Sequence, residues 1–203
     1  MKMLLKSAIA AAALTVPSLA MAAEYVFDPA HTTAQFAVKH LMVTNVRGNF
    51  GKVTGKLNVD DKDITKSSVD VTIDASTIDT REPNRDNHLK SPDFFDVAKY
   101  PNITFKSTKV EKAGDKKLKV TGDLTIHGVT KQAVLDVDGP TPEIKYPGQP
   151  EMRRGASATT KISRKDFGLT WNQALEAGGV AVGDEVTVFL EIEALRKLPA
   201  PAK

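Results

Sequence analysis

The sequence predicts an all-β fold, an eight-stranded antiparallel barrel with two short helical or loop interruptions. Eight segments between residues 33 and 193 alternate apolar and polar side chains, with the period of two that is typical of strands. The connections between them are mostly short, and nowhere do strands and helices alternate as a parallel sheet requires. A two-sheet sandwich fits this pattern nearly as well. The barrel is favoured because closure leaves no exposed edge and leaves room for one small ligand.

The first 22 residues have the features of a cleaved secretory signal. Lys2 and Lys6 supply the charged end, residues 4–19 are mostly apolar, and Ala20-Met21-Ala22 fits a small-x-small cleavage site. The apolar stretch is short for a membrane anchor. We therefore expect an exported, periplasmic chain that begins near Ala23.

Composition excludes several classes of function. The chain has 28 Lys and Arg against 25 Asp and Glu, so removal of Lys2 and Lys6 leaves 26 against 25, a net charge of +1. Lysines at single outward positions, such as Lys52 and Lys119, indicate a solvated face and not a nucleic-acid surface. The chain has no cysteine, which excludes disulfides, a thiol nucleophile and Cys-ligated metals.

The expected strands follow one another along the chain, each with one apolar face. Tyr25–Phe27 opens the domain before the bend at Asp28-Pro29-Ala30. The eight strands are then 33–40, a long second strand that ends at 59, 69–75, 102–111, 118–126, 133–137, 152–162 and 186–193. The strand 118–126 has the most regular alternation along the chain.

The alternation stops between residues 81 and 105. Residues 84–90 are expected to form one or two helical turns, and Ser91-Pro92-Asp93 has the pattern of an N-cap, a first helical residue and a dipole-matched acid. The large apolar side chains of this segment are Leu89, Phe94 and Phe95. The segment is too short to bury them alone, so we expect it to cover the mouth of the barrel. Arg81, Arg85 and Asp86 are expected to tie it there by hydrogen bonds, with recognition of an anion as the alternative.

A second interruption spans residues 163–183. Residues 172–177 are expected to form a short helix that Gly178-Gly179 ends. Trp171, the only tryptophan, lies close in sequence to Phe167, and both are expected to close the mouth opposite the aromatic residues of the first interruption.

Two further segments are expected to be irregular. Residues 139–150 contain four prolines and predict a loop, and residues 195–203 predict a flexible tail. The chain is therefore interpreted as a signal at 1–22, one barrel domain at 23–194 and a tail.

The inward positions of the strands form the candidate ligand site, with an ordinary filled core as the alternative. These positions are Phe36, Val38, Val71, Ile73, Ile103, Phe105, Leu124, Ile126 and Val188. By themselves they favour the filled core. Gly55 and Gly122, also at inward positions, argue modestly for an unfilled interior. His40 shares this face and is a candidate contact for a polar head group, although a hydrogen-bonded structural histidine is the simpler interpretation.

No sequence motif supports a particular enzyme. The four histidines are isolated and lack metal-ligand spacing. The sequence contains no Gly-x-Ser-x-Gly elbow, phosphate loop or dinucleotide fingerprint. An enzyme acting on a lipophilic substrate would need an acid or base inside the pocket, and His40 is its one candidate. A stress-related protein-binding module ranks last, because the assignable outward residues are mostly charged.

Several motifs occur in a specific order over nearly the whole chain after residue 22. They are Asp28-Pro29-Ala30-His31, Phe36-Ala37-Val38-Lys39-His40, the run 84–96, Tyr100-Pro101-Asn102-Ile103-Thr104-Phe105, the run 122–130, Arg164-Lys165-Asp166-Phe167-Gly168-Leu169 and Val182-Gly183-Asp184-Glu185-Val186. In these motifs the chain closely resembles the YceI-like family of periplasmic, lipocalin-like polyisoprenoid-binding proteins.

The resemblance implies a lipocalin-like barrel, export to the periplasm, and a polyisoprenoid or isoprenoid-quinone-like long-chain amphiphile held inside. It implies a carrier or reservoir with no catalytic residues and no cofactor, and it favours a ligand site over a filled core. The expected ligand-binding set adds His40, Leu89, Phe94, Phe95, Phe167 and Trp171 to the nine inward positions. The expected partner is a lipid and not a nucleic acid, and a homodimer is compatible with the sequence.

Overall fold

The computed structural model describes residues 22–176 and 178–198, so all but the last residue of the expected signal lies outside the described residues. Twelve strands lie within these ranges: β1 Ala23–Phe27, β2 Thr33–His40, β3 Thr44–Phe50, β4 Val53–Val59, β5 Ser68–Asp74, β6 Ile78–Asp79, β7 Asn102–Gly114, β8 Lys117–Ile126, β9 Val129–Asp138, β10 Ile144–Lys145, β11 Glu151–Ser163 and β12 Val182–Lys197. The helical elements are α1 Pro83–Lys90 and three 3₁₀ turns, η1 Ile64–Lys66, η2 Ala75–Thr77 and η3 Arg164–Phe167. In the described part of the chain no helix is long and apolar enough to cross a membrane.

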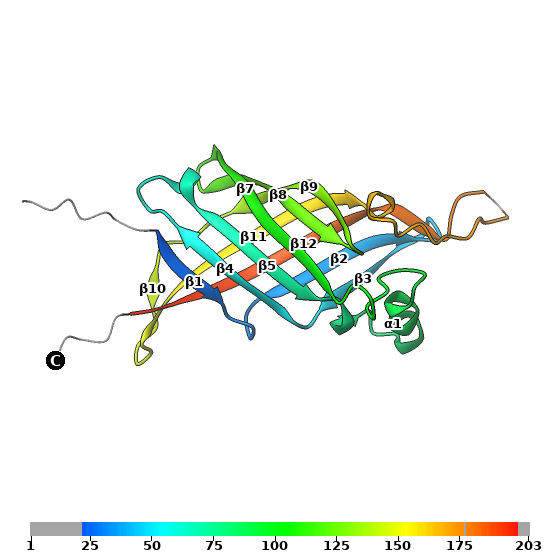
Figure 1. The fold of residues 1–203 in the computed structure, drawn as a ribbon, viewed down its shortest axis with the longest axis horizontal. Helices are drawn as coiled ribbons and strands as arrows, with labels where there is room; N and C mark the ends of the chain where they lie inside the picture. The colour runs from blue at the N-terminus through cyan, green and yellow to red at the C-terminus, as the bar shows by residue number, and fades with distance from the viewer. Residues whose placement is uncertain (1–21, 177, 199–203) are drawn as a thin grey trace, which may run out of the picture.

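The strands form one antiparallel sheet that closes on itself (Figure 1). The order is β10-β11-β9-β8-β7-β5-β4-β1-β12-β2-β3-β6, and the ring closes where β11 also pairs with β12. β1 and β2 both pair with β12, so together they form one strand of the barrel. β3 and β4 pair with β2 and β1 and form the next barrel strand. β5 and β6 pair with β4 and β3 and form the one after that. The short strands therefore build a closed barrel of eight antiparallel strands. This confirms the predicted fold class, and the two-sheet sandwich is wrong.

The long second strand takes the predicted path but is broken in the middle. Gly51 and Lys52 leave the ladder between β3 and β4. Their backbone N–H groups instead donate to Thr77 of η2, Gly51 to the carbonyl oxygen and Lys52 to Oγ1, each at 3.3 Å. The break and the 3₁₀ turn thus satisfy each other at the bend of the barrel wall.

The first interruption contains the expected helix, but its caps differ from the prediction. Glu82 is the N-cap of α1 and its carboxylate accepts from two backbone N–H groups, while Pro83 is the first helical residue. Ser91 is the C-cap and not an N-cap: its N–H and its Oγ both donate to the carbonyl of His88, at 3.1 and 2.8 Å. Oγ of Ser91 also accepts from the N–H of Asp93 at 3.3 Å, but residues 92–95 form turns and no second helix follows.

The helix expected at 172–177 is wrong. Ala174 forms an isolated antiparallel bridge with Val180, and Gly178 and Gly179 turn the chain with positive φ angles. The reason lies in Asn172, whose side chain donates to the carbonyl of Val182 at 2.7 Å and accepts from its N–H at 3.0 Å. The side chain of Asn172 thus forms hydrogen bonds with both backbone groups of Val182, the first residue of β12. These bonds hold the start of the loop beside β12 in an extended conformation.

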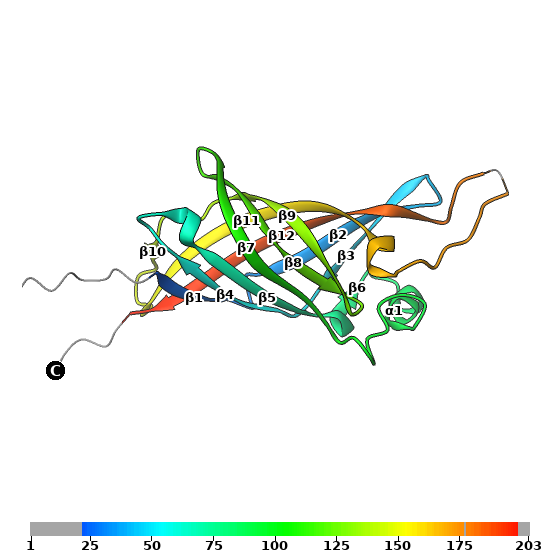
Figure 2. The same ribbon diagram turned by 45° about the horizontal axis from the view of Figure 1, so that its top comes forward.

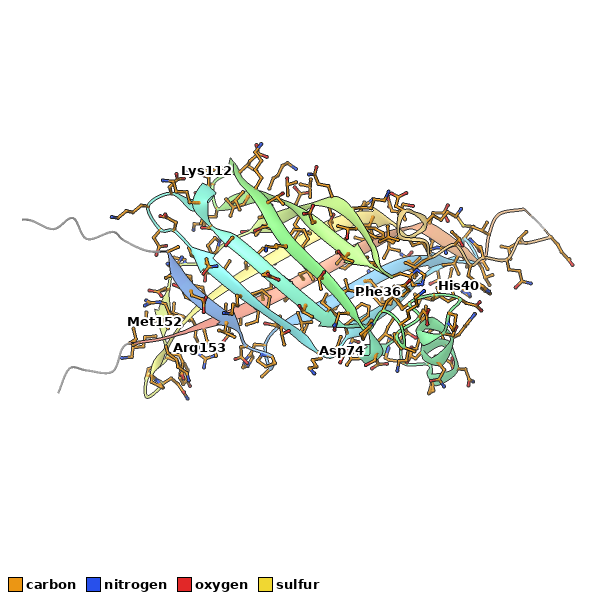
Figure 3. All side chains as sticks on the ribbon, viewed as in Figure 1. Phe36, His40, Asp74, Lys112, Met152 and Arg153 are labelled. Carbon is orange, nitrogen blue, oxygen red and sulfur yellow. The ribbon has the colours of Figure 1, made fainter. Side chains whose placement is uncertain are left out.

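The predicted start of the tail is three residues too early. β12 continues through Lys197, which pairs with Glu151 of β11. Residues 199–203 of the expected tail lie outside the described residues. Lys112 points outward from the barrel in Figure 3, and the four lysines at 52, 56, 106 and 119 are exposed.

Candidate functional site

The barrel encloses an apolar cavity of about 230 Å³, called the bore below. Its wall includes Ile64 of η1 at one end and Leu89 of α1 at the other, so it follows the length of the barrel. The polar members of the wall are few: Gln35, Ser67, Ser68, Thr104, Thr160 and Arg164. The volume is more than ten times the ~10–15 Å³ that one water needs, and so apolar a cavity stays dry or binds an apolar guest.

Some of the side chains that face the bore remain partly accessible, while others, such as Phe105, are buried. Val186, Val188, Leu190 and Ile192 lie on the inward face of β12, yet each is only half-buried. In a filled core such positions would be fully buried. Their accessibility therefore comes from the hollow in front of them.

Twelve of the fifteen predicted ligand-binding residues line the bore: Phe36, Val38, Val71, Ile73, Leu89, Phe94, Phe95, Ile103, Phe105, Leu124, Ile126 and Val188. The other three do not. His40 is the last residue of β2, opposite Val182 and Thr44, and Figure 3 places it at the opposite end of the barrel from Met152 and Arg153. Phe167 is buried within η3, behind the wall. Trp171 lies at the mouth.

The mouth is the gap in the sheet at the α1 end. β6 pairs only with β3, while β7 begins at Asn102 opposite Asp74, so β6 and β7 are not hydrogen-bonded to each other. α1 and the segment that follows it cover this gap (Figures 1 and 2). Arg85 anchors α1, as expected, by donating to Oγ1 and the carbonyl of Thr80 at 2.7 and 2.8 Å, and Asp86 accepts from the N–H of Thr80 at 2.9 Å. The prediction is wrong for Arg81, which is exposed and whose side chain forms no hydrogen bond within the described residues.

An aromatic cluster joins the two interruptions across the mouth. His88 of α1 lies edge-on to both Phe94 and Trp171, with ring centroids 5.0 and 4.9 Å apart, and Phe94 is 5.3 Å from Trp171. Phe95 continues into the wall through Phe50, at 5.9 Å. The mouth is thus covered by aromatic side chains that pack against one another from both interruptions.

Arg164 is the one charged residue among those lining the bore, and it is 5% exposed. Its guanidinium donates to four backbone carbonyls: Gly183 at 2.9 Å, Leu169 at 2.5 Å, Trp171 at 2.8 Å and Val182 at 3.3 Å. Burial lowers the pKa of Arg164, partly offset by a nearby aspartate, yet arginine starts so high that it stays charged. This side chain pins the loop that carries Trp171 onto β12.

A polar network joins two loops at the opposite end of the barrel. Tyr25 is fully buried, and its hydroxyl donates to the carboxylate of Glu143 at 2.5 Å. The guanidinium of Arg196 donates to both carboxylate oxygens of Glu143, at 2.8 and 2.9 Å. Arg154 lies over the Tyr25 ring and donates to Asp61 at 2.7 Å. Burial raises the pKa of Glu143, but the bonds from Tyr25 and Arg196 outweigh it, so the pKa is lowered overall. The network holds the 139–150 loop against this end.

The interpretation of the inward glycines needs correction. A Cβ on Gly122 would lie 2.5 Å from Cζ of Phe105, and one on Gly55 would lie 2.7 Å from Cε2 of Phe27. The space in front of both glycines is therefore filled by aromatic rings. The glycines allow those rings to lie flat on the sheet, and the unfilled space lies beyond the rings.

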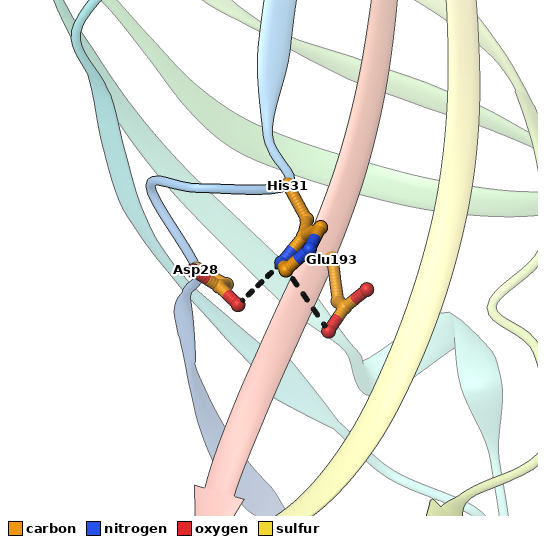
Figure 4. Close-up of side chains that lie close together, drawn as sticks. All are labelled: Asp28, His31 and Glu193. Atoms are coloured by element: carbon orange, nitrogen blue, oxygen red, sulfur yellow. Dashed lines mark hydrogen bonds and ion pairs between the residues drawn. The ribbon is translucent and has the colours of Figure 1, made fainter.

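Asp28, His31 and Glu193 form a cluster whose ligand atoms lie within 4.8 Å of one another (Figure 4). Nδ1 of His31 is 2.8 Å from Asp28 and 4.0 Å from Glu193. Arg153 forms ion pairs with both carboxylates, so its guanidinium already balances their negative charge. The hydrogen bond to Asp28, followed by the charge of Glu193, raises the pKa of His31. The cluster fits an ion-pair network that fixes the β1–β2 turn on β12, and not a metal centre.

Several wall residues were missing from the prediction. Leu190 and Ile192 share the inward face with Val188 and could have been found by alternation. Phe50 could not, because the break after β3 interrupts the period of two. Arg164 carries no apolar signal at all, and only the fold shows that it belongs to the wall.

Residues 25–194 match the family model of the YceI-like domain. A UPF0312 protein of Vibrio cholerae serotype O1 is 39% identical over 175 residues, which are 83% of this chain and 89% of the relative. The crystal structure of a Campylobacter jejuni YCEI protein matches with a TM-score of 0.66 and 36% identity, over 79% of this chain and 90% of that one. A polyisoprenoid binding domain from Saccharophagus degradans matches with a TM-score of 0.59 and 16% identity, over 88% and 99%, a likeness of fold.

Proposed function

This chain belongs to the YceI-like family, and on that premise we propose that it is a non-catalytic lipid-binding protein, a carrier or reservoir. Its barrel holds a polyisoprenoid or isoprenoid-quinone-like amphiphile by the hydrocarbon tail. The observation that carries the proposal is the apolar bore, whose inward side chains stop short of filling it. The structural likeness to a polyisoprenoid binding domain supports the same class of ligand.

The energetics of such a wall suit a chain-like ligand. Each CH₂ buried contributes about 0.8 kcal/mol, so one isoprene unit contributes up to roughly 4 kcal/mol before the cost of ordering it. A few buried units are enough for firm binding, and a wall with few polar groups selects girth and length over head-group chemistry. The head group then stays at the mouth, beside the exposed pair of His88 and Asp93.

Binding is favoured over catalysis by the placement of the polar groups. His40, the acid–base candidate from the sequence, lies outside the wall. Arg164 has its donors engaged by backbone carbonyls and cannot serve as a base. The periplasm is the proposed compartment, on the evidence of the signal pattern at 1–22.

The test is extraction of lipid from the protein purified from the host that makes it, followed by mass spectrometry. Val188→Phe puts a ring into the bore, and Thr187→Phe puts the same ring on the neighbouring outward position as a control. We expect a prenyl lipid from the wild type and from Thr187→Phe, and little from Val188→Phe. Added prenyl lipid should also change the fluorescence of Trp171. An empty extract together with unchanged fluorescence would rule the proposal out.

A further inference from the structure

The hairpin that joins β2 and β3 ends in three consecutive exposed apolar side chains, called the apolar tip below. Leu41 is 42% exposed, Met42 53% and Val43 79%. Figure 2 shows this hairpin reaching past α1 at the mouth end of the barrel. Single exposed apolar residues are normal on a soluble protein, but a contiguous group on a projecting point marks a contact site.

The backbone of the apolar tip is also unfavourable for these residues. The N–H of Val43 donates to the carbonyl of His40 at 3.0 Å, which closes a two-residue turn. Leu41 and Met42 occupy it with φ angles of 50° and 60°. Such turns favour Asn and Gly, because a side chain is strained at positive φ. Large apolar residues here are unfavourable both in conformation and in solvation, which points to a function.

The apolar tip is continuous with the mouth of the bore. His40 pairs with Val182, a wall residue, and the N–H of Leu41 donates to the carbonyl of Ala181 at 2.8 Å. Met42 lies against Gly179, where an added Cβ would come within 3.3 Å of its Cγ. The hairpin and residues 179–182 therefore lie side by side next to the opening.

The charged side chains of the hairpin that carries the apolar tip are all basic. Residues 29–59 contain no Asp or Glu, and Lys39 and Arg47 flank the tip. On the neighbouring strand Asp184 and Glu185 are paired with lysines, at 2.7 and 2.9 Å. Glu176 is the acid of the adjacent loop. An apolar point flanked by basic residues has the chemistry that binds the interface of an anionic membrane.

We propose that the apolar tip docks on an anionic lipid membrane, with Leu41, Met42 and Val43 in the acyl boundary and the two basic residues at the head groups. A narrow hairpin point suits insertion between lipids better than a flat protein interface. Docking would bring the mouth against the bilayer. The proposed function explains this placement, but vesicle binding can be measured without any prenyl ligand, so the two proposals fail separately.

The experiment uses residues 23–203, which contain every strand of the closed sheet and lack the apolar signal. Sedimentation measures binding to vesicles that contain phosphatidylglycerol and to vesicles of phosphatidylcholine alone. Val43→Asp tests the tip, and Ile144→Asp, an equal charge change at a 61% exposed residue of the opposite end, is the control. We expect Val43→Asp to lose about tenfold or more in partitioning, with Ile144→Asp near the wild type. Lys39→Gln and Arg47→Gln should weaken only binding to the anionic vesicles.

A second measurement uses the absence of cysteine in the chain. An environment-sensitive dye on Val43→Cys should shift to the blue on contact with anionic vesicles, and the same dye on Ile144→Cys should not. Circular dichroism establishes that each variant is folded. Wild-type protein that does not sediment, equal partitioning of Val43→Asp, or a dimer in solution that Val43→Asp abolishes would overturn the proposal. The last result would assign the tip to a second copy of the chain.

Discussion

The anchor at Arg164 gives the most quantitative prediction. Arg164→Met keeps a long side chain but removes the guanidinium that binds four backbone carbonyls. Trp171 and Val182 are half-exposed, so water can replace the donor at their carbonyls. Leu169 and Gly183 are buried, and their carbonyls would lose this partner without replacement by solvent.

The magnitude follows from those two buried carbonyls. Each unsatisfied buried group costs about 1–3 kcal/mol, which gives roughly 2–6 kcal/mol. Methionine recovers part of this because the desolvation of a buried charge disappears. We therefore expect the free energy of unfolding to fall by about 3 kcal/mol. For a urea m-value of about 2 kcal/mol/M, the midpoint should drop by about 1.5 M.

The assay is urea unfolding followed by Trp171 fluorescence and by circular dichroism. Arg164→Lys keeps the charge but not the planar fork, and its loss should be intermediate. Arg81→Met makes the same exchange at an exposed residue and should change the free energy of unfolding by no more than about 0.5 kcal/mol. A loss below about 1 kcal/mol for Arg164→Met would refute the reasoning, because the carbonyls would then not depend on this side chain.

Three further predictions concern the wall of the bore, the mouth, and the polar network around Glu143 at the opposite end of the barrel. Gly122→Ala should lower the free energy of unfolding by about 1–3 kcal/mol, because the added Cβ would lie 2.5 Å from the ring of Phe105. Gly51→Ala is the control and should be nearly neutral, because its Cβ would have no neighbour nearer than 3.8 Å. Equal urea midpoints for the two variants would contradict this prediction. Phe94→Ala should shift Trp171 emission to the red because the indole loses the ring 5.3 Å away and gains water; an unchanged spectrum would mean that the ring does not shield it. Glu143→Gln should destabilise at neutral pH. The folded pKa of Glu143 lies below its ordinary 4.5, so the carboxylate stabilises above that pH and the benefit is lost as pH falls through the lowered value. The gap in unfolding free energy between wild type and Glu143→Gln should therefore shrink in acid, and a constant gap would contradict the assignment.

Much of the barrel follows from local chemistry that the sequence exposes. Strand β8 alternates between Leu118 and Ile126 because one face of a barrel strand must be buried and the other solvated, and this period is visible without coordinates. The position of α1 is visible for a similar reason, since Pro83 fits the first turn of a helix and no strand interior. All nine residues predicted at inward strand positions line the bore, because side-chain parity decides which face of a strand they occupy.

Other features depend on groups that are distant in the sequence. Asn172 prevents a helix by bonding to Val182, and Arg164 becomes a wall residue only because β12 brings carbonyls to it. His40 has the same parity as the inward residues, but it lies at the end of β2, beyond the bore. Parity alone therefore predicted wrongly that it faces the ligand site. The strand pattern fixed which side chains point inward. Whether these side chains fill the centre depends on the circumference of the closed sheet. The circumference is set by the number of strands and by the register of hydrogen bonds between them, and the sequence of one strand does not contain that information.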